Sequence, residues 1–233
     1  MGSEKRLSVI VPVFNERNTV AEIVRRMRRV ELPVDVEIIM VDDGSSDGTD
    51  KILAALQDST LHVVNHPTNL GKGAAIRTGL AHARGEFILI QDADLEYDPE
   101  DWPRLLRPLL RGSAQVVYGS RFRGERMDMP VGQWLGNRFL SLVTNVLYGT
   151  SLSDMETGYK LFDRSVLEGI TIDSDRFDFE PEFTAKILRR RIRIYEVPVS
   201  YAGRAVREGR KFTWRDNLRA VATLVRYRWK AGA

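Results

Sequence analysis

Two aspartates stand one residue apart in the middle of this chain, and their spacing suits metal chemistry. The stretch Asp92-Ala93-Asp94 lies just past the apolar run 87–90, after Gln91. If that run is a buried strand, both carboxylates emerge at its C-terminal end. Mg²⁺ is held by one or two carboxylates while phosphate oxygens complete its coordination. The pair therefore predicts a nucleoside diphosphate bound with its metal, and the competing interpretation is a solvated turn.

A second acidic turn, residues 42–49, also follows an apolar run and precedes a helical pattern. Asp43, at the end of that run, can accept hydrogen bonds from a nucleobase or a ribose, as an acidic residue does in dinucleotide-binding folds. Asp47 is a candidate N-cap, because its carboxylate can accept from free amides of the first helical turn. Capping requires only Asp47, so Asp43 remains a candidate nucleotide contact.

The motif Gly71-Lys72-Gly73 precedes a third helical pattern. Backbone N–H groups at a helix N-terminus favour anions, and the Lys72 ammonium adds positive charge. The motif therefore suits a phosphate cradle. It lacks the G-x-x-x-x-G-K-[ST] spacing of the nucleoside triphosphatase loop, and a tight turn remains the alternative.

Further cationic side chains could contact phosphates. Arg121 follows an apolar run that ends at Gly119, where a guanidinium would face the same edge and could bind a phosphate through two nitrogens. Arg204, Arg210 and Lys211 cluster on a glycine-containing stretch before the last helical segment. We expect this stretch to act as a phosphate clamp. For a single arginine, a surface salt bridge is the alternative.

The elements that must position these motifs alternate between apolar runs and helical patterns. The apolar runs are 7–13, 36–41, 61–65 and 87–91. Each is followed along the chain by a helical pattern, at 18–29, 49–56, 72–83 and 100–110 respectively. This alternation predicts an α/β fold with a mainly parallel sheet flanked by helices, whose strands are covered on both faces. Ligands of open α/β sheets bind outside the carboxyl ends of the strands. The acidic turns and the glycine-rich motif all fall at those ends.

The second half of the chain is less regular. Further strands are expected at 114–119, 159–162 and 192–201, and further helices at 132–148, 181–190 and 214–230. At 233 residues the chain fits one large α/β domain with a sizeable core. No internal repeat or linker divides it.

Composition excludes several classes of protein. With 43% hydrophobic and 29% charged residues and no cysteine, the chain is globular and has neither disulfides nor thiolate metal sites. Its three histidines argue against a zinc site or a histidine-dependent triad. No run approaches the ~20 apolar residues that span a bilayer, and the polar start has no signal-peptide core. These features predict a cytoplasmic protein, peripheral at the inner face of the membrane.

The last helical segment is basic and amphipathic, within a chain whose net charge is only +3. Its apolar residues recur at three- and four-residue intervals: Trp214, Leu218, Val221, Val225 and Trp229. Such a helix can lie in an anionic membrane interface. The alternative is a helix that covers the core and turns its basic face to solvent. The segment matches no recognised nucleic-acid-binding motif, so nucleic acid is not an expected partner.

Together these motifs resemble those of the inverting family 2 glycosyltransferases of GT-A fold, most closely the dolichol- or polyprenyl-phosphate mannosyltransferases and glucosyltransferases. The resemblance covers nearly the whole chain. Its segments are VPVFNE (11–16), VDDGSSDGT (41–49), NLGKGAA (69–75), QDADLE (91–96), GSRF (119–122) and DMETGYKLF (154–162). It implies one GT-A domain over 1–233, with a nucleotide-sugar-binding half at 1–121, an acceptor half with a phosphate-binding loop at 122–211, and a basic amphipathic helix at 212–233.

The resemblance also implies roles for individual residues. The nucleotide pocket would be lined by Pro12, Phe14, Glu16, Val41 and Asp43, with Asp92 and Ala93 at its floor. Asp94 would hold Mg²⁺ or Mn²⁺ together with Asp92. Many relatives carry glutamine where Glu96 stands, so Glu96 could join the metal as a charged ligand. Arg121, Arg204 and Lys211 would contact phosphates, and Arg210 competes with Lys211 for that role.

The implied reaction moves mannose or glucose from GDP-mannose or UDP-glucose to a polyprenyl or dolichyl phosphate, with inversion. The metal and the cationic side chains would stabilise negative charge on the departing diphosphate. A lipid phosphate is already an anion and needs no general base, whereas a hydroxyl acceptor would need one, and Asp154 or Glu156 could serve. The alternatives are a transferase with a soluble or polysaccharide acceptor, and a non-catalytic nucleotide-sugar-binding subunit of a membrane complex.

Overall fold

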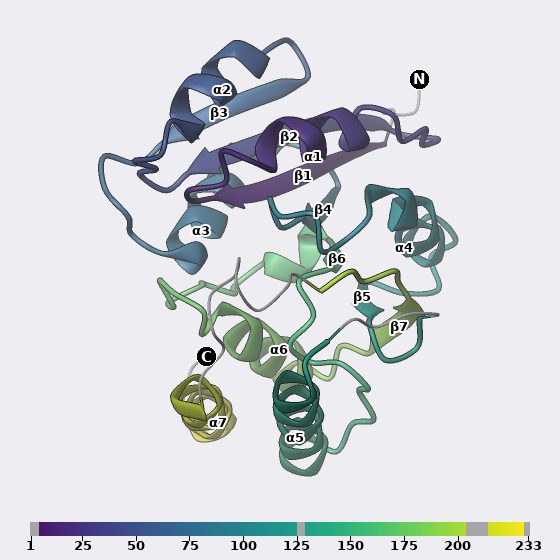
Figure 1. Cartoon of the computed structure of the whole chain (residues 1–233). Helices are drawn as coiled ribbons and strands as arrows, with labels where there is room; N and C mark the ends of the chain where they lie inside the picture. The colour runs from purple at the N-terminus through teal and green to yellow at the C-terminus, as the bar shows by residue number, and fades with distance from the viewer. Residues whose placement is uncertain (1–4, 125–128, 204–213, 231–233) are drawn as a thin grey trace.

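The computed structural model describes residues 5–124, 129–203 and 214–230. Within these ranges the strands form one sheet in the order β3-β2-β1-β4-β6-β5-β7 (Figure 1). The strands are β1 (Arg6–Val13), β2 (Asp35–Asp42), β3 (Leu61–Asn65), β4 (Phe87–Ile90), β5 (Val116–Ser120), β6 (Lys160–Asp163) and β7 (Ile194–Pro198).

The pairing of the strands confirms the predicted mainly parallel sheet. β1 is parallel to β2 and to β4, β2 to β3, and β5 to β7, whereas β6 runs antiparallel between β4 and β5. β4 is buried along its whole length. Because both faces of the sheet are covered, its sequence Phe-Ile-Leu-Ile is continuously apolar.

The helices also follow the predicted pattern. They are α1 (Val20–Met27), α2 (Thr49–Leu56), α3 (Lys72–His82), α4 (Trp102–Leu110), α5 (Val131–Tyr148), α6 (Phe179–Arg189) and α7 (Trp214–Trp229), with 3₁₀ turns at Pro99–Asp101 and Arg164–Leu167. The helix expected at 100–110 begins as the first of these turns and becomes α4 at Trp102. Pro99 and Pro103 lack an amide donor and so suit these first turns, where no such donor is needed.

Alternate residues of the strands enter separate hydrophobic clusters on the two faces of the sheet. Val9 and Val11 of β1 belong to one cluster, with α1 and α4, and Ile10 belongs to the other, with α3 and α6. A smaller cluster joins α5, α6 and α7 through residues such as Leu140 and Leu224. These three helices gather at the end of the molecule opposite to α2 (Figure 1). No helix within the described ranges is both long and apolar enough to cross a bilayer.

Candidate active site

The loops after β1 and β2 are joined by hydrogen bonds at the carboxyl edge of the sheet. The Asn15 N–H donates to Ser45 Oγ (2.9 Å), and the Ser46 N–H donates to Asn15 Oδ1 (2.9 Å). The Arg17 N–H donates to Asp47 Oδ2 (3.1 Å). These polar turns lie together as expected, because parallel strands end on the same side of a sheet.

Asp43 is buried beneath this edge, and its carboxylate is bonded to protein groups. It accepts hydrogen bonds from His66 Nδ1 (2.7 Å), the Leu70 N–H (2.9 Å) and the Gly71 N–H (2.8 Å). An ionised carboxylate can only accept, so His66 Nδ1 is the donor, and His66 Nε2 forms a hydrogen bond with the Thr78 hydroxyl (2.9 Å). Asp43 therefore holds the loop that leads into α3. No sequence motif pointed to His66, which orients this carboxylate.

The glycines around Lys72 make room for a distant part of the chain. A Cβ added at Gly71 would lie 2.3 Å from the Asp175 carbonyl oxygen, and one at Gly73 would lie 2.1 Å from that of Ser174. The amide that follows Gly73 donates to the same Asp175 oxygen (3.0 Å). Three amides of this turn, those of Leu70, Gly71 and Ala74, are therefore already bonded to protein. This packing favours the tight turn, and a phosphate contact at Lys72 stays a prediction.

Lys72 points instead to the first aspartate of the Asp92-Ala93-Asp94 motif. Its Nζ lies 2.7 Å from Asp92 Oδ1 and 2.8 Å from Glu180 Oε1, at the start of α6. Burial alone would lower the pKa of Lys72, but the two carboxylates outweigh it and hold the pKa well above its usual value. Lys72 is therefore a buried ammonium that neutralises Asp92. No sequence pattern pointed to Glu180, because its partners are distant along the chain.

Asp94 and Glu96 occupy the turn after β4, and both are half-buried. Asp94 Oδ1 accepts the Glu96 N–H (3.1 Å), and Glu96 Oε2 accepts the Tyr201 hydroxyl (2.9 Å). Among the described residues no three histidine or carboxylate side chains converge as a preformed metal cage. The physical reason is that Asp92 faces Lys72 and Glu96 faces Tyr201. The carboxylate oxygens at this edge still match the donors that Mg²⁺ and Mn²⁺ prefer.

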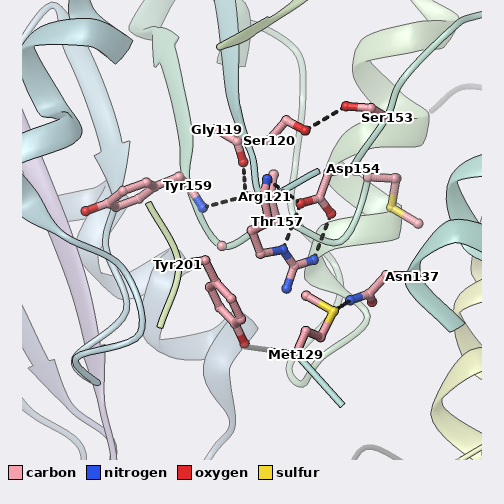
Figure 2. Close-up of polar contacts among 12 residues, drawn as sticks. Gly119, Ser120, Arg121, Met129, Asn137, Ser153, Asp154, Thr157, Tyr159 and Tyr201 are labelled. Atoms are coloured by element: carbon pink, nitrogen blue, oxygen red, sulfur yellow. Dashed lines mark hydrogen bonds and ion pairs between the residues drawn. The ribbon is translucent and has the colours of Figure 1, made fainter. Parts of the chain in front are cut away.

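Arg121, at the end of β5, is buried and clamped by Asp154 (Figure 2). Arg121 Nε donates to Asp154 Oδ2 and Nη2 to Oδ1, both at 2.7 Å, and the Arg121 N–H donates to Oδ2 (3.0 Å). The guanidinium carbon lies 5.4 Å from the centre of the Tyr201 ring. The third nitrogen, Nη1, has no partner in the described part of the chain. Arg121 is thus held rigidly with one nitrogen available for a ligand.

Glu196 of β7 fixes the segment that carries Asp154. Its carboxylate accepts the Ser153 N–H (2.9 Å), the Ser153 hydroxyl (2.9 Å) and the Asp154 N–H (3.0 Å), and it forms an ion pair with Arg123 (3.1 Å). The chain of contacts therefore runs from Glu196 through Asp154 to Arg121. The sequence did not indicate Glu196, which reads as an ordinary polar residue of an edge strand.

Two tyrosines and a glycine connect the acidic turn with the Arg121 pair. Tyr201 bonds Glu96 and lies against Arg121, as described above. The Gly158 N–H donates to the Tyr97 hydroxyl (2.8 Å), and a Cβ added at Gly158 would lie 2.2 Å from Asp92 Oδ2. The segment after Asp154 therefore packs directly against Asp92, where only glycine fits. The acidic and cationic groups belong to one site.

Glu156 and Lys160 are further ionisable residues beneath this site. Burial, reinforced by the charge of Glu180, raises the pKa of Glu156, and its Oε1 is buried without a hydrogen-bond partner in the described ranges. Burial lowers the pKa of Lys160, whose Nζ donates to the carbonyl oxygens of Met155 (3.1 Å) and Thr157 (2.5 Å). Of the two candidate bases, Asp154 is committed to Arg121, and Glu156 forms no such ion pair with the residues that the structure describes.

The other residues that the sequence places in the site differ in how deeply they are buried. Val41 and Ala93 are core residues, Pro12 and Glu16 are half-buried, and Phe14 is exposed on the loop after β1. Thr19 Oγ1 donates to the Glu16 carboxylate (2.5 Å). Three expected phosphate contacts lie outside the described residues: Arg204, Arg210 and Lys211.

Known proteins resemble this chain in sequence and in fold. The family model described as Glycosyl transferase family 2 matches residues 8–171. A solved structure of glucosyl-3-phosphoglycerate synthase from Mycobacterium tuberculosis, in complex with Mn²⁺, uridine diphosphate and glucosyl-3-phosphoglycerate, superposes with a TM-score of 0.73 at 23% identity and covers 96% of this chain and 80% of that one. The likeness concerns the fold, and the expected GT-A architecture is confirmed.

Curated relatives are similar over most of this chain. A low-salt glycan biosynthesis hexosyltransferase of Haloferax volcanii is 30% identical over 84% of this chain and 47% of its own length. An undecaprenyl-phosphate 4-deoxy-4-formamido-L-arabinose transferase of Pseudomonas fluorescens is 29% identical over 85% and 58%. A dodecaprenyl-phosphate galacturonate synthase of Rhizobium johnstonii is 29% identical over 97% and 68%. The chain thus spans about half to two thirds of the length of these relatives.

Proposed function

Because the chain belongs to glycosyl transferase family 2, we propose that it transfers a sugar from a nucleoside diphosphate donor to a polyprenyl phosphate, with inversion. The observation that carries the proposal is the acidic turn 92–96 beside the buried guanidinium of Arg121, joined through Tyr201. Carboxylates can hold a cation, and a guanidinium suits a phosphate. Their place at the carboxyl edge of the sheet is where open α/β folds bind ligands.

In this proposal the donor is GDP-mannose or UDP-glucose. Its base would lie at the loops after β1 and β2, near Phe14 and Glu16, and its diphosphate would reach Nη1 of Arg121. Asp94 would hold Mg²⁺ or Mn²⁺, with Asp92 and Glu96 joining from either side. When bound, the cation would neutralise negative charge on the diphosphate. Arg204, Arg210 and Lys211 stay proposed as further phosphate contacts.

The names of two relatives, which include undecaprenyl-phosphate and dodecaprenyl-phosphate, support a polyprenyl phosphate acceptor. Such a phosphate is an anion at neutral pH and can attack without a general base. This fits the geometry of Asp154, both of whose carboxylate oxygens are already engaged by Arg121. Residues 1–121 would bind the donor and 122–211 the acceptor, with the chain peripheral at the inner face of the membrane.

A transfer assay tests the proposal. The protein is incubated with radiolabelled GDP-mannose or UDP-glucose, Mg²⁺ or Mn²⁺, and a polyprenyl phosphate, and the product is extracted into organic solvent. We expect lipid-soluble label that disappears with a chelator and falls on the order of a hundredfold or more in Asp94→Asn. Asp98→Asn, on the same loop but paired with Arg26, is the matched control and should keep its activity.

The opposite results are equally clear. Label found only in water-soluble product would replace the lipid acceptor by a soluble one. Donor binding without transfer to any acceptor would favour a non-catalytic subunit. Full activity of Asp94→Asn, together with full activity of the control in the presence of chelator, would remove the metal from the reaction.

A further inference from the structure

The outer face of α5 exposes a continuous row of large apolar side chains. Leu135, Phe139, Leu142 and Val146 are 55%, 52%, 60% and 76% exposed, and Val131 extends the row to the start of the helix. Their spacing of three or four residues places them along one side of the helix. The row runs the length of α5, so it is a surface and not a single exposed residue.

The opposite side of α5 already packs against the protein. Leu140, Ser141 and Thr144 are buried there, next to α6 and α7. An ordinary surface helix has one apolar side, which faces the core, and a polar side in solvent. On α5 the buried side consists of small and polar residues around Leu140, whereas the large apolar side chains face outward, so folding of this domain does not account for the exposed row. The exposed row requires a second apolar environment.

α7 lies beside α5 and adds a second exposed row. The two helices run side by side in the same direction, since a Cβ at Gly136 would meet Asn217 near their first turns and Arg228 Nε donates to the Leu147 carbonyl (2.9 Å) near their last. On α7 the exposed apolar residues recur at helical spacing: Leu218, Ala222, Val225 and Trp229. The two exposed rows together are called the helix surface below.

The exposed charges beside the two apolar rows are positive among the described residues of α5 and α7. α5 contains no aspartate or glutamate over Val131–Tyr148, and Arg138 is exposed beside its apolar row. On α7, Arg219 and Arg226 are exposed beside the second row, and the one acidic residue, Asp216, lies in the first turn. Apolar rows flanked by arginines match the interface of an anionic bilayer, where acyl chains lie beneath negatively charged headgroups.

We propose that the helix surface lies on an anionic lipid bilayer, with α5 as its principal contact. This inference rests on the proposed function and adds that the site lies at the membrane surface. Phe122, next to Arg121, contacts the first turns of α5: its ring lies 6.3 Å from that of Trp134 and 5.4 Å from the Arg138 guanidinium. A lipid phosphate held at the headgroup level would therefore lie near the Arg121 end of the site.

Vesicle binding of the full chain, measured without donor, metal or acceptor, tests the proposal. Phe139→Glu and Leu142→Glu place a charge on exposed positions and should fold normally. We expect each to weaken co-sedimentation with phosphatidylglycerol-containing vesicles by roughly tenfold or more, because the charge must enter an apolar and anionic layer. Tyr195→Glu, at an exposed aromatic residue on β7, is the matched control and should bind like the wild type.

Thermal stabilisation by UDP or GDP with Mn²⁺ should be the same in all these variants, so a failed donor site and a failed membrane surface give different results. Equal vesicle binding by Phe139→Glu and the wild type would overturn the proposal. A wild-type dimer in sedimentation equilibrium that Phe139→Glu converts to a monomer, with no change in vesicle binding, would assign the helix surface to a second copy of the chain and would also overturn it.

Discussion

At the scale of single residues, the most informative feature is the buried pair of Arg121 and Asp154. The side chains are 6% and 0% exposed, and two parallel hydrogen bonds join them. A buried ion pair contributes little net stability compared with apolar residues of the same volume, but removing one partner leaves an uncompensated buried charge. The pair is therefore better explained by a need to aim the guanidinium than by a need for stability.

This argument predicts the effect of Asp154→Asn. The variant should lose about 3–5 kcal/mol of unfolding free energy, since Arg121 stays charged and buried without its partner. The double variant Arg121→Met/Asp154→Leu should be more stable than Asp154→Asn, although it lacks the candidate phosphate contact. Urea denaturation measures both. A double variant as unstable as the single one would mean that the pair contributes to folding in a way that apolar packing cannot replace.

At the scale of elements, α7 is attached to the rest of the molecule through its last turns. Arg189 Nη1 donates to the carbonyl oxygens of Tyr227 (3.0 Å) and Lys230 (2.7 Å) at the end of the helix. Asp173 accepts hydrogen bonds from the Tyr227 hydroxyl (3.0 Å) and from the ammonium groups of Lys186 and Lys230 (both 3.2 Å). The two Arg189 bonds satisfy helix-end carbonyls that would otherwise lack partners, and the Asp173 bonds add side-chain contacts. They hold α7 beside α6 and leave its outer row exposed.

The Asp173 contacts predict a pH-dependent anchor. Burial would raise the pKa of Asp173, but the hydrogen bonds from Tyr227, Lys230 and Lys186 outweigh it and lower the pKa to about 2. The folded-state pKa lies below the usual value of 3.8, so the stabilisation is present above that value and is lost as the pH falls toward 2. Asp173→Asn should be less stable than the wild type at pH 7, and the difference should shrink between about pH 4 and pH 2.

Thermal unfolding across that range measures the effect. Asp175→Asn removes a more exposed carboxylate, paired with Arg77 on α3, and should change stability little. A difference between Asp173→Asn and the wild type that stays constant down to pH 2 would contradict the assignment of this anchor to an ionised carboxylate.

At the scale of the whole molecule, the start of α3 is where the two halves of the chain meet. The segment 172–175 packs on this helix, and Arg77 Nη1 donates to the carbonyl oxygens of Ile172 (3.2 Å) and Ser174 (3.3 Å). Gly73 allows the approach, since a Cβ there would lie 2.1 Å from the Ser174 oxygen. The same segment leads to α6 and Glu180, which holds Lys72 beside Asp92. Close packing at one glycine therefore supports the geometry of the site.

Gly73→Ala should separate these segments. We expect a loss of about 1–3 kcal/mol in unfolding free energy, because backbone must move to admit the methyl group. Gly132→Ala, a helical glycine whose Cβ would meet nothing within 4 Å, is the control and should be neutral or slightly stabilising. Urea denaturation of both variants gives the comparison. Equal stability of the two would show that the segment at 174 adapts without cost.

The sequence by itself determined the alternation of strands and helices, the edge at which the polar turns gather, and the family, because these follow from local periodicity and from motifs in fixed order. Only the tertiary structure decided that Lys72 pairs with Asp92 and Glu180, that Asp154 clamps Arg121, and that Asp43 is bonded within the protein. These partners lie far apart along the chain, and packing selects them. The exposed apolar row of α5 is also a feature that only the tertiary structure decided. Periodicity shows that a helix has an apolar side, but only its neighbours in the fold decide which residues remain exposed.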